Sequence, residues 1–293
     1  RSGITDIGAG QTSSLAQIAA ELLGVNMDAI TVYNSDSSTT PLAGTSTATR
    51  GLYMSGNAAR LAAERLRGRL VARAARKFGV EPDDVDLAES TAFVIDDRER
   101  SMPLEELVVI CASEGIRRNE LAMFRAPFGD WIDSETGQGQ VHADYTYGAH
   151  AAEVTVDTET GEVTIVKSIG AHDVGQAVNS DAVEGQIAGG ATQGHGYALS
   201  EELIYKDGKL ITPSLSEYLC PTSMDTPSIQ SIIFESRSGL GPFGAKGIGE
   251  PAHTPAAPAV ANAVADAIGV RIHDLPLTPE KIVWALREKE RAE

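Results

Sequence analysis

A single acid closes a glycine-rich stretch near the carboxyl end of the chain. Residues 241–260 read GPFGAKGIGEPAHTPAAPAV, with four glycines before Glu250 and small apolar residues after it. Glycines let backbone N–H groups approach a ligand closely, and an apolar helix behind the acid would remove water from its carboxylate. Desolvation raises the pKa of a carboxyl group and makes it a usable base near neutral pH. The alternative is an acid without a chemical role that sits favourably ahead of a helix N-terminus.

Three further stretches of glycine and hydroxyl residues precede predicted helices. They read DIGAGQTSS at 6–14, AGTSTATRG at 43–51 and GGATQGHGYALSEE at 189–202. Backbone N–H groups and hydroxyls in such loops suit a phosphorylated cofactor with many hydrogen-bonding groups. Three loops of this kind, together with one lone acid, predict a large anionic cofactor and one protein base.

Other chemical signatures are weaker. The spelling GLGPFG at 239–244 matches a dinucleotide-binding pattern, but Pro242 interrupts it and the predicted helix starts about ten residues later. The six histidines and two cysteines show no metal-ligand spacing, so we expect no metal bound directly by this chain. We expect Cys111 and Cys220 to be reduced thiols. The histidines are expected at the surface or in the core, with His195 kept as a candidate because it lies among glycines.

The length and net charge of the chain limit the number of domains and the kinds of partner that it can have. A chain of 293 residues with 42% hydrophobic residues can form one large domain or two ordinary ones. Its net charge of −17 argues against nucleic acid or an anionic membrane surface as a partner. No apolar run approaches the roughly 20 residues of a spanning helix and no signal peptide is present, so we expect a cytoplasmic protein. The chain opens without Met inside a predicted strand, which favours a processed chain, a truncated chain or part of a split subunit.

Hydrophobic periodicity favours an α+β fold, with mixed sheets, hairpins and packed helices, over a doubly wound parallel sheet. We expect a first subdomain over residues 1–145 and a second over 146–293 that carries Glu250. Segment 37–51 is either a flexible linker or an ordered binding loop, and 114–145 shows no assignable pattern. The expected helices cover 12–23 with Thr12 or Ser13 as N-cap, 55–77, 103–113, 180–200, 254–268 and the residues from 278. The expected strands cover 1–8, 29–36 and 228–236, together with hairpins that turn at 158–161 and 207–208.

These stretches, in this order, resemble the C-terminal half of the molybdopterin-binding subunit of the xanthine dehydrogenase/aldehyde oxidase family. The segment GAKGIGEPAHTPAAPAVANAVADAIGVRIHDLPLTPEKI at 244–282 is similar to the family's ending, and 36–58 and 185–203 resemble two other family segments. The resemblance covers nearly the whole chain. It implies the second molybdopterin-binding domain of a molybdenum hydroxylase, similar to the medium molybdopterin subunit found in two-polypeptide members such as nicotinate dehydrogenase.

The resemblance also implies roles for particular residues. Glu250 matches the acid of the family's G-x-G-E motif, which lies beside the molybdenum and acts as the base, with Gly247 and Gly249 as the motif's glycines. Gln193 matches the glutamine that hydrogen-bonds the pterin. The second cofactor loop matches Gly44, Thr45, Ser46, Thr47, Ala48 and Thr49.

The first cofactor loop departs from the family pattern. Its usual form is G-Q-G, whereas this chain has Gly8, Ala9 and Gly10 followed by Gln11. Either Gln11 substitutes from the next position, or that hydrogen bond is lost and Ala9 contacts the cofactor only through its backbone.

The implied cofactor is molybdopterin with molybdenum, in bacteria usually as the cytosine dinucleotide. The family's partners would be an N-terminal molybdopterin chain, an iron–sulfur subunit with [2Fe–2S] clusters and an FAD subunit. The implied reaction hydroxylates an N-heteroaromatic or aldehyde substrate with water as the oxygen source, and this chain would act only within the complex. The rival hypothesis is a non-catalytic binding or assembly module that retains the fold, and Ala9 is its support.

Overall fold

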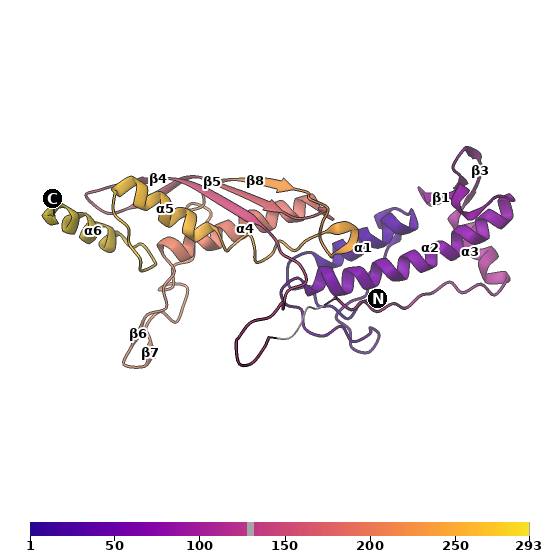
Figure 1. Ribbon diagram of the computed structural model, residues 1–293, viewed down its shortest axis with the longest axis horizontal. Helices are drawn as coiled ribbons and strands as arrows, with labels where there is room; N and C mark the ends of the chain where they lie inside the picture. The colour runs from indigo at the N-terminus through magenta and orange to yellow at the C-terminus, as the bar shows by residue number, and fades with distance from the viewer. Residues whose placement is uncertain (128–131, 293) are drawn as a thin grey trace. The chain divides into compact units, whose positions relative to one another are not determined.

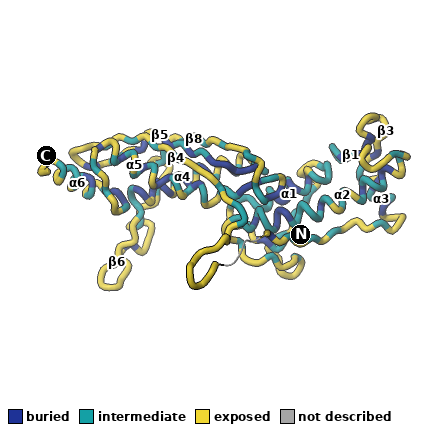
Figure 2. The backbone as a smooth tube through the Cα atoms, viewed as in Figure 1, coloured by how far each residue is buried: buried dark blue, intermediate teal, exposed yellow. Residues whose placement is uncertain are grey.

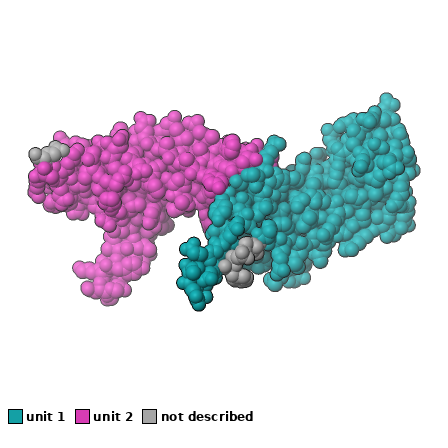
Figure 3. Space-filling view, viewed as in Figure 1, with its two compact units in different colours: residues 1–145, 237–246 teal, residues 146–236, 247–293 magenta. Residues whose placement is uncertain are grey.

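The computed structural model describes residues 1–127 and 132–292. The chain divides into two compact units, Arg1–Tyr145 with Arg237–Lys246 and Thr146–Ser236 with Gly247–Glu293 (Figure 3). The glycine-rich stretch that opened the sequence argument is therefore shared. Its first part, 237–246, belongs to the first unit, and Glu250 belongs to the second. Separate roles for residues 1–145 and 146–293 stay a prediction.

The first unit is built on the long helix α2. α1 packs along α2, and a small antiparallel sheet in the order β1-β2-β3 packs against α2 together with α3 (Figure 1). The core here is apolar and includes Leu70, Ala74 and Leu107. The elements are α1 (Gln11–Leu23), α2 (Asn57–Phe78), β1 (Val85–Ala88), β2 (Thr91–Val94), β3 (Asp97–Pro103) and α3 (Leu104–Ser113), with short helical turns η1 (Met27–Ala29), η2 (Gly51–Gly56), η3 (Pro82–Asp84) and η4 (Pro242–Gly244).

The second unit is a sheet with helices on one face. Its strand order is β4-β5-β8, with β4 and β5 antiparallel and β8 parallel to β5, and α4 and α5 pack together beneath the strands (Figure 1). α5 buries the residues spaced three and four apart along one stripe, including Val260 and Val264, as an amphipathic helix does. The elements are β4 (Gly148–Val156), β5 (Val163–Asp173), α4 (Ser180–Leu199), β6 (Tyr205–Lys206), β7 (Lys209–Leu210), β8 (Ser228–Phe234), α5 (Ala256–Ile268) and α6 (Pro279–Ala292).

The α+β class, the predicted helices and both hairpins are confirmed. In the β6–β7 hairpin, Asp207 and Gly208 both have positive φ, 49° and 75°, which is the geometry that a two-residue Asp-Gly turn favours. Figure 2 shows this hairpin exposed along its length. Among the residues that the structure describes, no helix is long and apolar enough to cross a membrane.

Several predictions of secondary structure are wrong. Segments 1–8 and 29–36 are not strands, because their only backbone pairing among the described residues is the isolated parallel bridge between Ser2 and Asn34. α1 begins at Gln11 after Gly10, so neither Thr12 nor Ser13 is its N-cap. The β1–β3 sheet was not predicted, because β3 carries the charged run DRERS and lacks an apolar alternation.

Candidate functional site

The first glycine loop is shaped by a carboxylate. The side chain of Asp6 accepts hydrogen bonds from the backbone N–H of Gly8 at 3.1 Å and of Thr12 at 2.9 Å. Burial acts to raise the pKa of Asp6, but these hydrogen bonds outweigh it and hold that pKa below its usual value. Gly8 and Gly10 have φ of 101° and 74°, a conformation that favours glycine, and no described heavy atom lies within 4 Å of where their Cβ atoms would sit. The loop therefore presents bare backbone on an open side.

The second glycine loop is ordered by side chains at both ends. Asp36 accepts hydrogen bonds from Ser38 and Thr39, which hold the pKa of Asp36 below its usual value. The guanidinium of Arg50 donates to the carbonyl of Thr45 at 3.1 Å and reaches that of Ala43 at 3.4 Å. These contacts favour an ordered binding loop over a flexible linker for 37–51. Within the described part of the chain, no hydrogen bond uses the hydroxyls of Thr45, Thr47 or Thr49.

The two loops of the first unit lie side by side. The hydroxyl of Ser46 donates to the carbonyl of Thr5 at 2.8 Å and accepts from its N–H at 3.1 Å. Gln11 lies against Gly51, where a Cβ would come within 3.0 Å of the Gln11 Cγ. The structure thus brings Gly8–Gln11 and Gly44–Thr49 together.

Gln11 carries an unsatisfied acceptor. Its Oε1 atom is buried and has no hydrogen-bond partner among the described residues. A buried acceptor without a partner costs roughly 1–3 kcal/mol unless a ligand or water supplies a donor. Substitution by Gln11 stays a prediction, and a ligand that carries N–H groups would satisfy this acceptor. Ala9, by contrast, offers only its backbone.

Glu250 lies on the surface of the second unit. Its backbone carbonyl accepts hydrogen bonds from the N–H of His253 at 3.0 Å and from the hydroxyl of Thr254 at 3.3 Å. Its carboxylate makes no hydrogen bond or ion pair with any described residue. The expectation that this chain desolvates the carboxylate is wrong, because α5 begins only at Ala256 and the side chain remains exposed.

The segment that follows Glu250 runs along α4. A Cβ on Gly190 would meet Ala252 at 2.7 Å, and one on Gly194 would meet Ala256 at 2.4 Å, so only glycine permits this approach. A Cβ on Gly249 would lie 3.4 Å from the Oε1 of Gln186, which is one turn before Gly190 in α4. Segment 249–256 therefore follows three successive turns of α4.

Gln193 is exposed on the same helix and lies two turns after Gln186, about 10 Å along the axis. The structure thus places Gln193 and the Glu250 segment on one helix–loop pair of the second unit. Gln186 was not singled out from the sequence. The sequence feature that could have identified Gln186 is its spacing of seven residues from Gln193, which puts the two side-chain amides on one face of the helix. Gly247 is held through its carbonyl, which accepts from the hydroxyl of Thr146 at 3.2 Å.

His195 belongs to a group of histidines in the second unit, of which His172 and His195 are buried and His150 is partly buried, rather than to the candidate site. Its Nε2 lies 3.1 Å from the Ser168 hydroxyl, and His150 Nε2 lies 2.7 Å from His172 Nε2. Burial lowers the pKa of His195 to about 4, and burial together with His172 lowers that of His150 to about 4. These neutral rings fill the space between α4 and the sheet. The described cysteines are both unpaired, Cys111 buried and Cys220 exposed.

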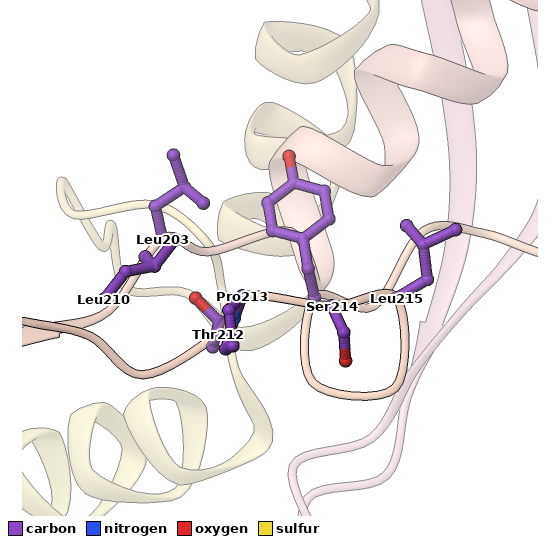
Figure 4. Close-up of a pocket in the computed structure, with 7 residues that line it drawn as sticks. Leu203, Leu210, Thr212, Pro213, Ser214 and Leu215 are labelled. Carbon is purple, nitrogen blue, oxygen red and sulfur yellow. The ribbon is translucent and has the colours of Figure 1, made fainter.

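A hollow of about 320 Å³ lies at the base of the β6–β7 hairpin (Figure 4). It contains none of the predicted site residues, so it is not the candidate site. Leu203, Leu210 and Leu215 give it an apolar wall.

The paired loops of the first unit present backbone N–H groups and hydroxyls, which suit a large polar cofactor. A family model described as "molybdopterin cofactor-binding domain" matches residues 1–227. The chain belongs to this family, and the resemblance to the molybdopterin-binding subunits of the xanthine dehydrogenase/aldehyde oxidase family is confirmed.

Known relatives are similar across almost all of the chain. The nicotine 6-hydroxylase large subunit of Paenarthrobacter nicotinovorans is 32% identical over 98% of this chain and 35% of its own length. The xanthine dehydrogenase molybdenum-binding subunit of Escherichia coli O157:H7 is 31% identical over 96% of this chain and 37% of its own. The crystal structure of quinoline 2-oxidoreductase from Pseudomonas putida 86 superposes with a TM-score of 0.83 at 31% identity, covering 97% of this chain and 36% of that one. The chain thus spans about a third of the length of these relatives.

Proposed function

We propose that this chain is the molybdenum-cofactor-binding part of a multi-subunit hydroxylase that carries Glu250 as its base. The family match over residues 1–227 carries the proposal. The complex would oxidise an N-heteroaromatic or aldehyde substrate, with water as the oxygen donor, as the names of relatives such as nicotine 6-hydroxylase and quinoline 2-oxidoreductase suggest. The unpartnered Glu250 carboxylate supports this activity over a non-catalytic module.

Each predicted site residue has a role that its surroundings permit. The N–H groups of Gly8–Gln11 and the hydroxyls of Thr45, Thr47 and Thr49 would hold the cofactor's polar groups, and Gln11 Oε1 would accept one of its N–H donors. Gln193 would hydrogen-bond the pterin from α4. Gly247 and Gly249 carry no side chains, so the backbone before Glu250 would be able to approach the cofactor closely. Bound there, the molybdenum cofactor supplies two-electron oxidation. Glu250 would take a proton at its carboxylate, and the bound cofactor and substrate would exclude water from it.

The finer parts of the proposal rest on the family resemblance. The cofactor would be the cytosine dinucleotide form of molybdopterin. Electrons would pass to [2Fe–2S] clusters and FAD in partner subunits, and the rest of the molybdenum-binding portion would come from sequence outside these 293 residues. Relatives whose names describe a gamma or a large subunit support an assembly of several subunits. We propose that the assembly lies in the cytoplasm.

The first test is metal analysis of the native complex isolated through this chain. We expect about one molybdenum and about four irons per copy, which two [2Fe–2S] clusters require. Molybdenum without iron would support the cofactor and remove the iron–sulfur partner. A complex that holds no molybdenum, isolated from cells supplied with molybdate, would favour the non-catalytic module.

A further inference from the structure

In the glycine-rich segment 237–246 of the first unit, hydrogen bonds hold both the backbone N–H and the backbone carbonyl of Leu240. The N–H of Leu240 donates to Asp144 Oδ2 at 2.9 Å, and its carbonyl accepts from Asn57 Nδ2 at 2.8 Å. The loop otherwise closes on itself, through hydrogen bonds from Gly239 N to the Gly244 carbonyl and from Gly241 N to the Ala245 carbonyl. Leu240 is therefore a point at which two distant segments of the chain fasten the loop.

The groups that hold Leu240 are also joined to each other. The hydroxyl of Tyr53 donates to Asp144 Oδ2 at 2.6 Å, and Asn57 Nδ2 also donates to the carbonyl of Tyr53 at 2.9 Å. The Asn57 side chain is buried, with only 2% of the residue exposed. Removing one member of this partly buried polar network leaves its partners unsatisfied, so these groups favour a single arrangement. We call Tyr53, Asn57 and Asp144 the Leu240 clamp.

The Leu240 clamp follows directly on the second cofactor loop. The backbone N–H of Tyr53 donates to the carbonyl of Thr49, the last residue of that loop, at 2.9 Å. Gly51–Gly56 form a π-helix, a rare geometry that occurs mostly as single turns and frequently at functional sites. Hydrogen bonds therefore run without a break from Thr49 through Tyr53 and Asp144 to Leu240.

We infer that Tyr53, Asn57 and Asp144 are positioning residues that couple occupation of the second cofactor loop to the placement of residues 237–246, from which the chain continues to Glu250. The inference rests on the proposed function, in which Gly44–Thr49 hold the cofactor and Glu250 is the base. Lys246 ends the first unit's part of the glycine loop, and Glu250 follows four residues later along the chain. A ligand that orders the second cofactor loop restrains Tyr53, and through Asp144 it restrains Leu240 within 237–246.

The test is the substitution Tyr53→Phe, made in the full complex. It removes one hydroxyl and leaves the ring in place. The matched control is Tyr218→Phe, because Tyr218 donates to the carboxylate of Glu201 at the same 2.6 Å but belongs to the second unit and, among the residues that the structure describes, shares no hydrogen bond with the clamp. Asp144→Asn is the second clamp variant, since it keeps the shape of the side chain and removes the charge. The measurements are molybdenum content, kcat, KM, and hydrogen–deuterium exchange of residues 237–246 in complexes from cells grown with and without molybdate.

We expect both clamp variants to keep their molybdenum and their KM while kcat falls roughly 10- to 100-fold, as for a displaced catalytic group. We also expect hydrogen–deuterium exchange of residues 237–246 in the wild type to be slower when the cofactor is present than when it is absent. In the clamp variants it is faster and no longer responds to the cofactor. Tyr218→Phe leaves kcat and this exchange unchanged.

One result would contradict the coupling alone, and another would contradict the proposed function as well. Clamp variants with the wild-type kcat and the wild-type response of 237–246 to the cofactor would remove the coupling while leaving the proposed function intact. A wild-type complex that takes up no molybdenum would overturn the proposed function, and the coupling with it, before any variant is made.

Discussion

The Glu250 carboxylate makes no hydrogen bond or ion pair with any residue that the structure describes, whereas the Glu250 carbonyl is fixed by His253 and Thr254. A fixed backbone with an unengaged side chain suits a group that must accept a proton in one place. It does not suit an acid that serves only to cap a helix, because α5 begins six residues later.

Replacement of Glu250 by Gln should therefore separate binding from chemistry. Glu250→Gln keeps the size and hydrogen-bonding shape of the side chain but cannot take up the proton. We expect unchanged molybdenum content and a fall in kcat of about 10²- to 10⁴-fold in steady-state assays, the usual contribution of a positioned base. Glu184→Gln, at an exposed acid of the same unit, is the control. Near-normal turnover of Glu250→Gln would remove this residue from the mechanism.

The candidate site was only partly predictable at this scale. Glu250 stood out because one acid follows four glycines, a pattern that local sequence displays. The unsatisfied Oε1 of Gln11 could not be predicted, because its burial depends on Gly51, forty residues further along the chain. The Leu240 clamp depends on Asp144, which lies in a stretch without a recognisable pattern.

Among the elements, the packing of α4 on the segment that leads into α5 decides where Glu250 can lie. Gly194→Ala places a methyl group 2.4 Å from the Cβ of Ala256, so the segment must move away. Gly185→Ala makes the same change in the same helix, where no described atom lies within 4 Å. We expect Gly194→Ala to destabilise the protein by about 1–3 kcal/mol through overpacking, and Gly185→Ala to stabilise it by about 0.5–1 kcal/mol. Thermal unfolding of the two variants checks this, and equal effects would mean that the close approach is not limiting.

Elements with a strong local pattern were predicted and those that need distant partners were not. α2 and α5 repeat apolar residues every three or four positions, and the turn between β4 and β5 lies where the sequence places it. Segments 1–8 and 29–36 are rich in β-branched and apolar residues but reach only one bridge, since strand pairing requires neighbours that this chain does not provide among its described residues.

For the whole molecule, three histidines of the second unit link stability to pH. His150, His172 and His195 lie between the sheet and α4 of the second unit, and burial is the largest cause of the lowered pKa of each. In the unfolded chain these groups titrate near 6.5, whereas in the fold His150 and His195 titrate near 4. Between these values the unfolded state binds more protons, so the free energy of unfolding rises with pH. This contribution is complete above about pH 6.5 and is lost as the pH falls towards 4.

His150→Gln should flatten that dependence, because glutamine can still bond to His172 but takes up no proton. Hydrogen exchange of β5 amides in the assembled protein, corrected for the pH dependence of the intrinsic rate, gives the free energy of opening from pH 7.5 to 4.5. We expect the wild type to lose up to about 1.4 kcal/mol per pH unit more than the variant, the value for one proton. His273→Gln, at an exposed histidine, should keep the wild-type slope. Carboxylates such as Asp157, whose pKa is lowered by backbone hydrogen bonds from Thr160 and Glu159, act at lower pH. Identical slopes for His150→Gln and the wild type would therefore place the titration outside the histidine pair.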